Sequence, residues 1–376
     1  MLVGFDGKRA LKNYTGLGNY SRYVLQALVK YFPQNVYSVY SVNPPERALK
    51  SNLSSVIFKH LEGKKLAGLW RTFSIVDDLK RDGVEIYHGL SNEIPVGLSK
   101  SGIASIVTIH DLIFLRYPHF YRLIDRYIYY YKSKYACKNA DHIIAISEQT
   151  KRDIIHYFKI SEHKISVIYQ NCDPAFQEKF TPESKEEIRR FYKLPAKFIL
   201  NVGTIEPRKN LMLLAKALKT VSEEIHLVVV GKDTPYASKV RDYLQTNKLT
   251  HRIHFLKNVP LKDLPGIYQL ADLFVFPSKF EGFGIPIIEA LHSSVPVIAA
   301  SGSCLEEAGG PDSLYINPAD ATELAKKILE ILNDPTTKKR MIDKGLEYVN
   351  NFNDHAFAAT LIDIYQKTID HAKRRN

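Results

Sequence analysis

Short runs of apolar, β-branched residues alternate along this chain with segments whose apolar positions recur every three or four residues. Such alternation of strand and helix patterns is typical of α/β proteins with parallel sheets. In the first half, after a strand at the N-terminus, the pattern predicts strands at 36–42, 86–88, 103–109, 142–146 and 165–169, and helices at 20–30 and 151–157. Because these runs are mostly continuous in hydrophobicity, we expect the strands to be buried on both faces.

The same pattern restarts in the second half. It predicts strands at 197–202, 225–230, 253–255, 273–276 and 295–299, and a helix at 211–221. Between the halves, residues 173–195 are charged, contain three prolines and carry a short helical pattern at 184–192. The sequence therefore predicts two Rossmann-like, doubly wound α/β domains that face each other across a cleft, with ligands at the carboxyl ends of the strands.

The length of 376 residues is too great for one ordinary core and fits two domains. We assign residues 1–173 to an N-terminal domain, 174–195 to an interdomain linker and 196–354 to a C-terminal domain. Residues 355–376 form a C-terminal helix that can pack back on the N-terminal domain.

The cysteine and charge content limits the setting in which the protein works. Cys137, Cys172 and Cys304 lie far apart, so we expect neither a zinc site nor a disulfide framework, and a reducing compartment. With no apolar run of signal-peptide or membrane-spanning length, we expect a cytoplasmic protein.

The net charge of +12 is unevenly distributed, with 25 basic against 16 acidic residues in 1–180. A basic half favours a phosphorylated substrate, an anionic membrane face or nucleic acid as partner. A solvated basic surface with no partner is the alternative.

The strongest chemical signal is the segment PSKFEGFGIPIIEA at 277–290. A strand runs into a loop with Gly282 and Gly284, followed by a helix that we expect to open at Pro286. Glycines permit unusual φ values and close approach of the backbone, and the N–H groups at a helix start bind anions. This segment predicts a site for a diphosphate.

Two carboxylates flank that anion site. Glu281 precedes the glycine loop, and we place Glu289 in the first helical turn, so that both face one pocket and accept hydrogen bonds from sugar hydroxyls. The alternative is structural: acids are favoured in first turns, and loop carboxylates are commonly solvated.

The second signal is NVGTIEPRKN at 201–210, where a strand ends at Gly203 and Arg208 and Lys209 precede a helix. Cations at a helix start oppose the macrodipole, which favours a functional role. Arginine and lysine together can neutralise a leaving diphosphate without Mg²⁺.

Weaker signals lie in the first half. The segment TGLGNY contains Gly16 and Gly18, which could bring backbone near a phosphate, although a simple turn is the favoured interpretation of these glycines taken alone. His110 follows the strand at 103–109, where an imidazole can meet a sugar hydroxyl, although an ordinary loop histidine is the favoured interpretation without further context. Ser147 is expected to be a helix N-cap with a structural role.

These motifs together resemble the donor site of the large retaining glycosyltransferase family often called family 4, which has the GT-B fold. The resemblance covers nearly the whole chain, and HDLIFLRYP at 110–118 is most similar to mannosyltransferase-like members. It implies an acceptor-side domain at 1–173 and a nucleotide-sugar donor domain at 196–354. At 169–173, YQNCD departs from the family, which often has glycine where Asn171 stands.

The resemblance also implies roles for single residues. Glu289 holds the ribose, Glu281 lies by the transferred hexose, and Arg208 and Lys209 bind the diphosphate. His110 contacts the hexose. The remaining donor contacts come from backbone at Gly16, Gly18, Gly203, Gly282, Phe283, Gly284 and Ile285.

The motifs predict a mechanism without a metal or another cofactor. No Asp-x-Asp motif follows a strand, and Asp77 and Asp78 fit a helical surface pattern. The resemblance implies retention of configuration, and we see no covalent nucleophile, so we hypothesise front-face transfer with the departing diphosphate accepting the acceptor's proton.

GDP-mannose is the favoured donor, with UDP-sugars open, and a glycan or lipid-linked saccharide of a cell-surface polysaccharide is the expected acceptor. A nucleotide-sugar epimerase, a phosphorylase, and a membrane- or nucleic-acid-binding protein with an inactive cleft are the rival functions. We expect no nucleic-acid partner.

Aromatic and basic residues interleave at 114–138, FLRYPHFYRLIDRYIYYYKSKYACK. We favour an ordinary helix that buries its tyrosine rings. A face for a membrane or a lipid-linked acceptor, and a surface on which single-stranded nucleic acid stacks, are the alternatives.

Overall fold

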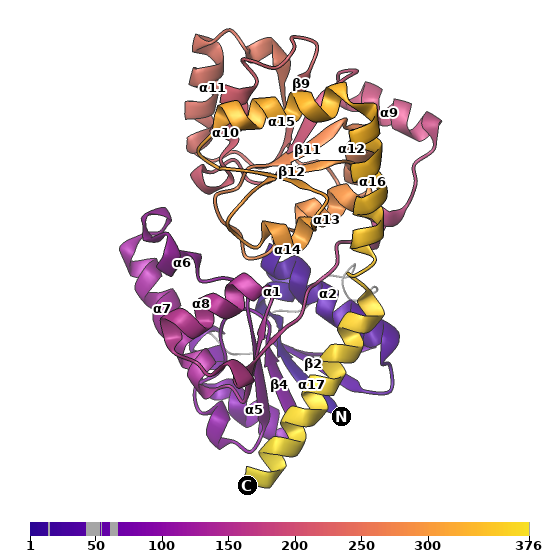
Figure 1. Cartoon of the computed structure of the whole chain (residues 1–376). Helices are drawn as coiled ribbons and strands as arrows, with labels where there is room; N and C mark the ends of the chain where they lie inside the picture. The colour runs from indigo at the N-terminus through magenta and orange to yellow at the C-terminus, as the bar shows by residue number, and fades with distance from the viewer. Residues whose placement is uncertain (14–15, 43–52, 54, 61–66, 376) are drawn as a thin grey trace. The chain divides into compact units, whose positions relative to one another are not determined.

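The computed structural model describes residues 1–13, 16–42, 53, 55–60 and 67–375. The chain divides into two compact units, each built on its own parallel sheet (Figure 1). The first unit is Met1–Gln170 with Phe352–Asn376, and the second is Asn171–Asn351. The expected α/β class with two Rossmann-like sheets is confirmed.

The first unit contains a seven-stranded parallel sheet with strand order β3-β2-β1-β4-β5-β6-β7. The order reverses between β1 and β4, which is where ligands bind in doubly wound folds. The strands are β1 (Leu2–Asp6), β2 (Val36–Ser41), β3 (Val56–His60), β4 (Ile86–Gly89), β5 (Ala104–Ile109), β6 (His142–Ala145) and β7 (Ile165–Val167).

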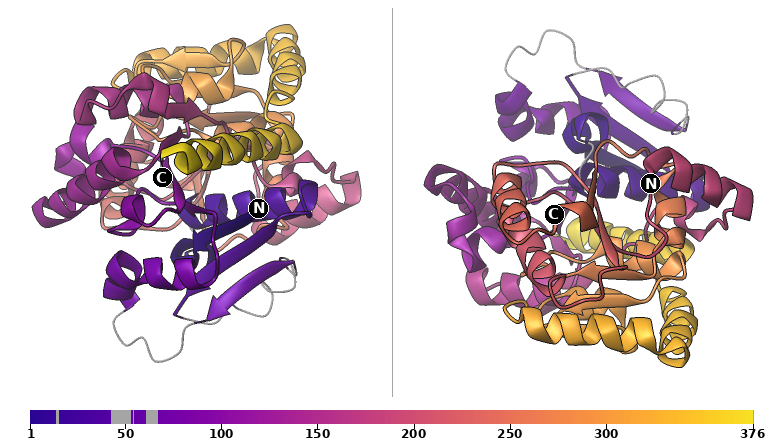
Figure 2. Two further views of the ribbon diagram at one scale, coloured as in Figure 1. Left: turned by 90° about the horizontal axis from the view of Figure 1, so that it is seen from below. Right: turned by 90° about the horizontal axis from the view of Figure 1, so that it is seen from above.

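Helices cover both faces of this sheet, because successive side chains of a strand point to opposite sides. Tyr87 and Val107 belong to a core with the helices α5 (Ile75–Arg81), α7 (Leu123–Asn139) and α8 (Glu148–Phe158). On the other face, His88 and Thr108 meet α2 (Gly16–Tyr31) and α17 (Asp354–Arg375). Figure 2 shows α17 as one long helix that ends at the C-terminus. Shorter elements are α1 (Gly7–Lys12), α4 (Ala67–Leu69), α6 (Ile113–Arg116) and a π-helical turn at Trp70–Ser74.

The second unit contains a six-stranded parallel sheet with the order β10-β9-β8-β11-β12-β13. Its order reverses between β8 and β11, as the first sheet does between β1 and β4. The strands are β8 (Phe198–Val202), β9 (His226–Val230), β10 (Ile253–Leu256), β11 (Leu273–Phe276), β12 (Val297–Ala300) and β13 (Leu314–Ile316).

The helices of the second unit form two groups. In the first group, α10 (Leu211–Ala217), α11 (Tyr236–Thr246) and α15 (Ala321–Asn333) share a hydrophobic core with the sheet. The second group packs together and includes α13, which lies on β11 and β12. Its members are α9 (Pro182–Tyr192), α12 (Leu264–Leu270), α13 (Ile285–His292), α14 (Leu305–Gly309) and α16 (Pro335–Val349).

The segment expected as a linker is built into the second unit. Within it, α9 packs on α12 so closely that a Cβ on Gly266 would lie 2.3 Å from Cδ1 of Ile188. The Tyr192 hydroxyl donates to Asp263 at 2.7 Å. The C-terminal helix α17 belongs to the first unit, where it packs on α2 and β5.

Candidate active site

The second unit gathers the main candidate residues at the reversal point of its sheet. Arg208 and Lys209 follow β8, and Glu281 follows β11, the strand hydrogen-bonded to β8. Because both strands are parallel, their carboxyl ends meet at the same edge of the sheet. Side chains separated by about 70 positions in the sequence are thereby brought into contact.

The contacts between these three side chains are ion pairs. A guanidinium nitrogen of Arg208 lies 2.5 Å from one oxygen of Glu281, and Nζ of Lys209 lies 2.7 Å from the other. Burial alone raises the pKa of Glu281, but the cations of Lys209 and Arg208 outweigh it and lower that pKa to about 2. Glu281 is therefore an anion at neutral pH, held between two cations.

Backbone hydrogen bonds join the two loops that carry these residues. The Lys279 amide donates to the carbonyl of Arg208 at 2.9 Å, and the Arg208 side chain donates to the carbonyl of Phe280 at 2.8 Å. Asn210, at a left-handed φ of 60°, donates to the carbonyls of Pro277 at 3.1 Å and Pro318 at 2.8 Å. Asparagine tolerates this backbone region better than most residues. These bonds hold Arg208 and Lys209 close to the loop that carries Glu281.

Gly203 is required by the turn that leaves β8. Its φ of 147° is one that side-chain-bearing residues rarely adopt, and its carbonyl lies 1.9 Å from where a Cβ on Gly231 would be. The Lys209 side chain runs beside Gly203, and its Nζ lies 4.8 Å from the centre of the Phe276 ring. The two glycines let the ends of β8 and β9 approach closely under the lysine.

The helix after the glycine loop differs in register from our expectation. It begins at Ile285, with Pro286 next to it, so Glu289 lies in the second turn and not in the first. The φ of Gly284 is 173°, which is ordinary extended backbone. Gly284 is needed for close packing instead, because a Cβ there would lie 2.9 Å from that of Ala308.

Glu289 lies in a different environment from Glu281. It is half-buried, and one oxygen accepts a hydrogen bond from the hydroxyl of Tyr268 at 2.8 Å. Burial raises the pKa of Glu289 to about 7, against the opposing effect of the Tyr268 hydrogen bond. The two carboxylates that the sequence pairs therefore have opposite pKa shifts, which is typical of functional sites.

Sequence reasoning missed two groups that support the glycine loop and α13. The Cys304 thiol lies 2.9 Å from the carbonyl oxygen of Phe283 and 3.1 Å from that of Glu281. Asn171 accepts a hydrogen bond from Nε2 of His292, the last residue of α13, at 3.1 Å. Asn171 is where the sequence departs from the family pattern, and this bond gives its side chain a structural partner.

His110 lies in the first unit, directly after β5. Its Nε2 is 2.8 Å from the carbonyl of Leu90, and since a carbonyl only accepts, Nε2 carries the proton. Burial, helped by the nearby Arg9 cation, lowers the pKa of His110 to about 4, so the ring is neutral at pH 7. The edge of Tyr20 packs on it with ring centres 4.7 Å apart. Nδ1 is therefore a hydrogen-bond acceptor.

The expected glycine loop at 16–19 is helical, because α2 begins at Gly16. Gly18 serves packing, since a Cβ there would lie 1.7 Å from the carbonyl oxygen of Asn13. The space around Gly16 is open.

Two further expectations have clear outcomes. Ser147 is confirmed as the N-cap of α8, accepting from the Thr150 amide at 3.0 Å, and the Thr150 hydroxyl donates to the carbonyl of His110. Asp78 was expected on the surface, which is wrong. It is buried and accepts from the Trp70 indole at 2.8 Å.

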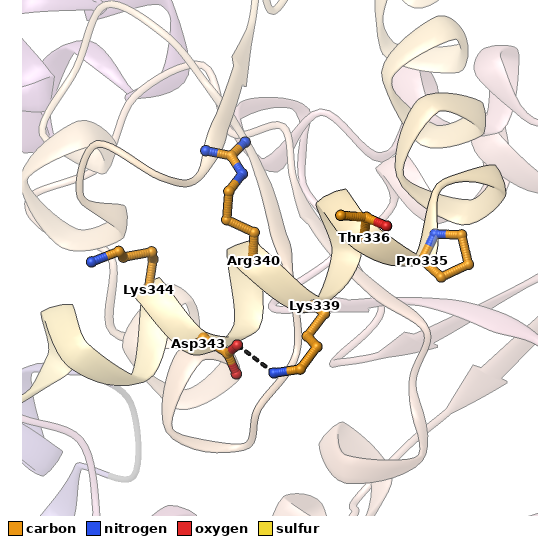
Figure 3. A pocket seen from close by; sticks show the side chains of 6 residues that line it. All are labelled: Pro335, Thr336, Lys339, Arg340, Asp343 and Lys344. Atoms are coloured by element: carbon orange, nitrogen blue, oxygen red, sulfur yellow. Dashed lines mark hydrogen bonds and ion pairs between the residues drawn. The ribbon is translucent and has the colours of Figure 1, made fainter.

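A shallow hollow of about 540 Å³ lies along α16, where Lys339 pairs with Asp343, and holds none of the predicted site residues (Figure 3). In the described ranges, no three His, Cys, Asp or Glu side chains are grouped as for a metal ion. No helix in the same part of the chain is both long and apolar enough to cross a membrane.

The structure therefore holds the candidate residues in two sets. Arg208, Lys209, Glu281 and Glu289 belong to the second unit, around the glycine loop and α13, and His110, Gly16 and Gly18 belong to the first. Two doubly wound parallel sheets define an α/β protein with a fold of the GT-B type.

Comparison with known proteins identifies the family. Residues 184–348 match the model described as glycosyl transferases group 1, and residues 15–176 match the model of glycosyltransferase family 4. These two matches together cover most of the chain, which belongs to this family of glycosyltransferases.

Curated relatives include mannosyltransferases. The chain is 27% identical over 286 residues to O-antigen chain mannosyltransferase B of Escherichia coli, covering 75% of this chain and 74% of that protein. It is 29% identical to O-antigen chain mannosyltransferase RfbU of Salmonella typhimurium, covering 62% of each. The match covers 57% of a D-inositol 3-phosphate glycosyltransferase of Corynebacterium efficiens, at 27% identity over 61% of this chain.

Solved structures share the fold over almost the full length. A glycosyltransferase from Rickettsia africae superimposes with a TM-score of 0.77 at 20% identity, covering 98% of both chains. Anabaena HepE in complex with UDP-glucose superimposes with a TM-score of 0.77 at 17% identity, covering 98% of this chain and all of the other. At these identities the likeness shows the fold alone.

Proposed function

We propose that this glycosyltransferase transfers mannose from GDP-mannose to a glycan or lipid-linked saccharide during synthesis of a cell-surface polysaccharide. The observation that carries the proposal is the cluster of Arg208, Lys209 and Glu281 at the reversal point of the second sheet. Two cations and an anion, held on adjacent loops beside a helix start, suit a charged diphosphate and the sugar attached to it.

Arg208 and Lys209 neutralise the diphosphate as it leaves, which is the work that Mg²⁺ does in other transferases, and no metal or other cofactor is required. Glu289 accepts from the ribose hydroxyls. The unprotonated Nδ1 of His110 accepts from a hexose hydroxyl, because Nε2 is occupied by the Leu90 carbonyl.

Transfer proceeds with retention of the anomeric configuration. The sequence offers no convincing candidate for a covalent nucleophile. We accordingly propose front-face attack, in which the departing diphosphate accepts the proton of the acceptor hydroxyl. Determining the anomer of the product tests this step, and an inverted linkage would overturn it.

The mannosyl donor and the polysaccharide acceptor are favoured by the O-antigen mannosyltransferases among the relatives. We propose that the reaction takes place in the cytoplasm, where nucleotide-sugars are made. A UDP-hexose is the second candidate donor, favoured by the UDP-glucose complex of a structural neighbour.

Calorimetric titration tests the donor site. Purified protein in EDTA is titrated with GDP, UDP, GDP-mannose and UDP-glucose, and then the Arg208→Ala, Glu289→Ala and Lys279→Ala variants are titrated. Lys279→Ala is the matched control, because this exposed cation lies on the same loop outside the ion-pair cluster. We expect one nucleotide class to bind wild type and the control, with at least tenfold weaker binding to the other two variants.

The remaining outcomes separate the alternatives. Binding that requires Mg²⁺ would overturn the metal-free mechanism, and selective binding of UDP would replace the donor. Consumption of donor without an acceptor and with no sugar transferred would point to an epimerase.

A further inference from the structure

The helix α7 carries an exposed apolar stripe. Its members recur at the spacing of one helical face, and they remain solvent-exposed by between 46% and 74%: Leu123 61%, Ile124 74%, Tyr127 57%, Ile128 46% and Tyr131 65%. Our preferred expectation, that this helix buries its tyrosine rings, is wrong for Tyr127 and Tyr131. Monomeric proteins rarely expose contiguous apolar side chains, and patches of this kind commonly mark interaction sites.

The opposite side of α7 is firmly anchored in the first unit. Ser133, Ala136 and Cys137 are buried, and the ring of Tyr130 packs on Phe158 with centres 5.9 Å apart. On the stripe's own face, one turn after Tyr131, the Tyr135 hydroxyl accepts from the amide of Gly97 at 3.2 Å. These contacts anchor α7 in the first unit, so the apolar stripe stays exposed to solvent.

Basic side chains border the stripe. Arg122, Arg126, Lys132, Lys134 and Lys138 lie on or beside α7, against one acidic residue, Asp125. Lys132 is paired with Glu93 at 2.7 Å, and Lys134 donates to the Tyr130 hydroxyl. The border keeps a net positive charge after these contacts, so the partner of this face should be both apolar and anionic.

We propose that the α7 stripe docks this enzyme on an anionic lipid bilayer. A helix that lies flat in the membrane interface combines branched aliphatic and aromatic side chains on one face with lysine and arginine beside it. Tyrosine rings are well suited to the interface, since one end is apolar and the hydroxyl remains hydrated.

Two other occupants fit the stripe less well. Bases of single-stranded nucleic acid stack on flat rings, whereas Leu123, Ile124 and Ile128 present branched carbons that cannot stack. A second copy of the same face would bring two basic borders together, and like charges directly opposed are destabilising. An anionic bilayer satisfies both the apolar stripe and its positive border.

Flotation of the full-length protein with lipid vesicles tests the proposal. We expect binding to phosphatidylglycerol-containing vesicles, at least tenfold weaker binding to pure phosphatidylcholine vesicles, and weakening by salt. The variant Ile124→Ser/Ile128→Ser should lose at least tenfold in partitioning. Phe191→Ser is the matched control, because this ring is 77% exposed on α9 in the other unit.

Each outcome bears on the proposal. Equal partitioning of the stripe variant and wild type, or no binding of wild type to anionic vesicles, would overturn it. A change in oligomeric state of the stripe variant by sedimentation would assign the face to a second copy, and loss of binding to a single-stranded oligonucleotide would assign it to nucleic acid. Circular dichroism and a urea titration of the variant show that it is folded, and since the donor site does not enter the test, the two proposals can fail separately.

Discussion

Replacing Glu281 by glutamine should make the nucleoside diphosphates GDP and UDP bind more tightly. The carboxylate of Glu281 pairs with both cations that we assign to the diphosphate, Arg208 at 2.5 Å and Lys209 at 2.7 Å. A diphosphate therefore competes with an anion that the protein itself supplies. Glutamine has the same shape but no charge, so it releases the cations for the ligand.

The size of the effect follows from the pKa of Glu281. A shift from the usual 4.5 to about 2 corresponds to about 3 kcal/mol of preference for the ionised form. This is a ceiling, because Glu206 also pairs with Arg208 at 2.6 Å and remains in the variant. If half of the ceiling is recovered on binding, affinity for GDP or UDP rises about tenfold.

The assay is calorimetric titration of wild type, Glu281→Gln and Glu206→Gln with GDP and UDP. Glu206→Gln is the control, because its side chain is 32% exposed and exposed pairs contribute only about 0–1 kcal/mol. The Glu281→Gln variant should be less stable than wild type without ligand at pH 7, since a lowered carboxyl pKa stabilises the fold above pH 4.5. Weaker GDP and UDP binding to Glu281→Gln would refute the reasoning and show that the carboxylate is needed to position the cations.

Three further predictions concern stability. Because the pKa of Glu289 is raised to about 7, the folded state binds this proton more tightly than the unfolded chain does. The free energy of unfolding of wild type should therefore fall by up to about 3 kcal/mol, relative to that of Glu289→Gln, as pH rises from 4.5 through 7. The same difference in urea midpoint between the two proteins at pH 5 and at pH 8 would contradict this. Gly203→Ala should cost about 2 kcal/mol through backbone strain at φ 147°, whereas Gly16→Ala, which meets open space, should be nearly neutral in the same urea titration. Ser147→Ala should cost about 1 kcal/mol by removing the cap of α8, with Ser161→Ala, which makes no capping hydrogen bond, as its control; similar losses in both would remove the cap as the cause.

Local chemistry explains why the sequence predicted the donor loops. A buried strand, a glycine-containing loop and a proline near a helix start have short-range signatures, and they placed the candidate loop after β11. The sequence indicates a functional role for the Arg208–Lys209 pair because cations at a helix start oppose the macrodipole.

Long-range packing explains what the sequence could not reveal. The contact between Arg208 and Glu281 depends on the pairing of β8 with β11, which no local pattern encodes. The glycine pattern predicts a loop near a phosphate at Gly18, whereas Gly18 lies inside α2 and lets that helix approach the Asn13 carbonyl. Asn210 belongs to the segment at 201–210, and only its left-handed backbone reveals why an asparagine is suited to that position.

The order in which the chain builds its two units has a consequence for making fragments. The second unit is one uninterrupted segment, Asn171–Asn351, inserted between two pieces of the first. One continuous stretch of chain therefore contains Arg208, Lys209, Glu281 and Glu289. The first unit needs its pieces joined, and the rings of Tyr169 and Phe352 lie only 6.0 Å apart at the junction. A few glycine and serine residues in place of the insert would reconnect it as a single continuous polypeptide.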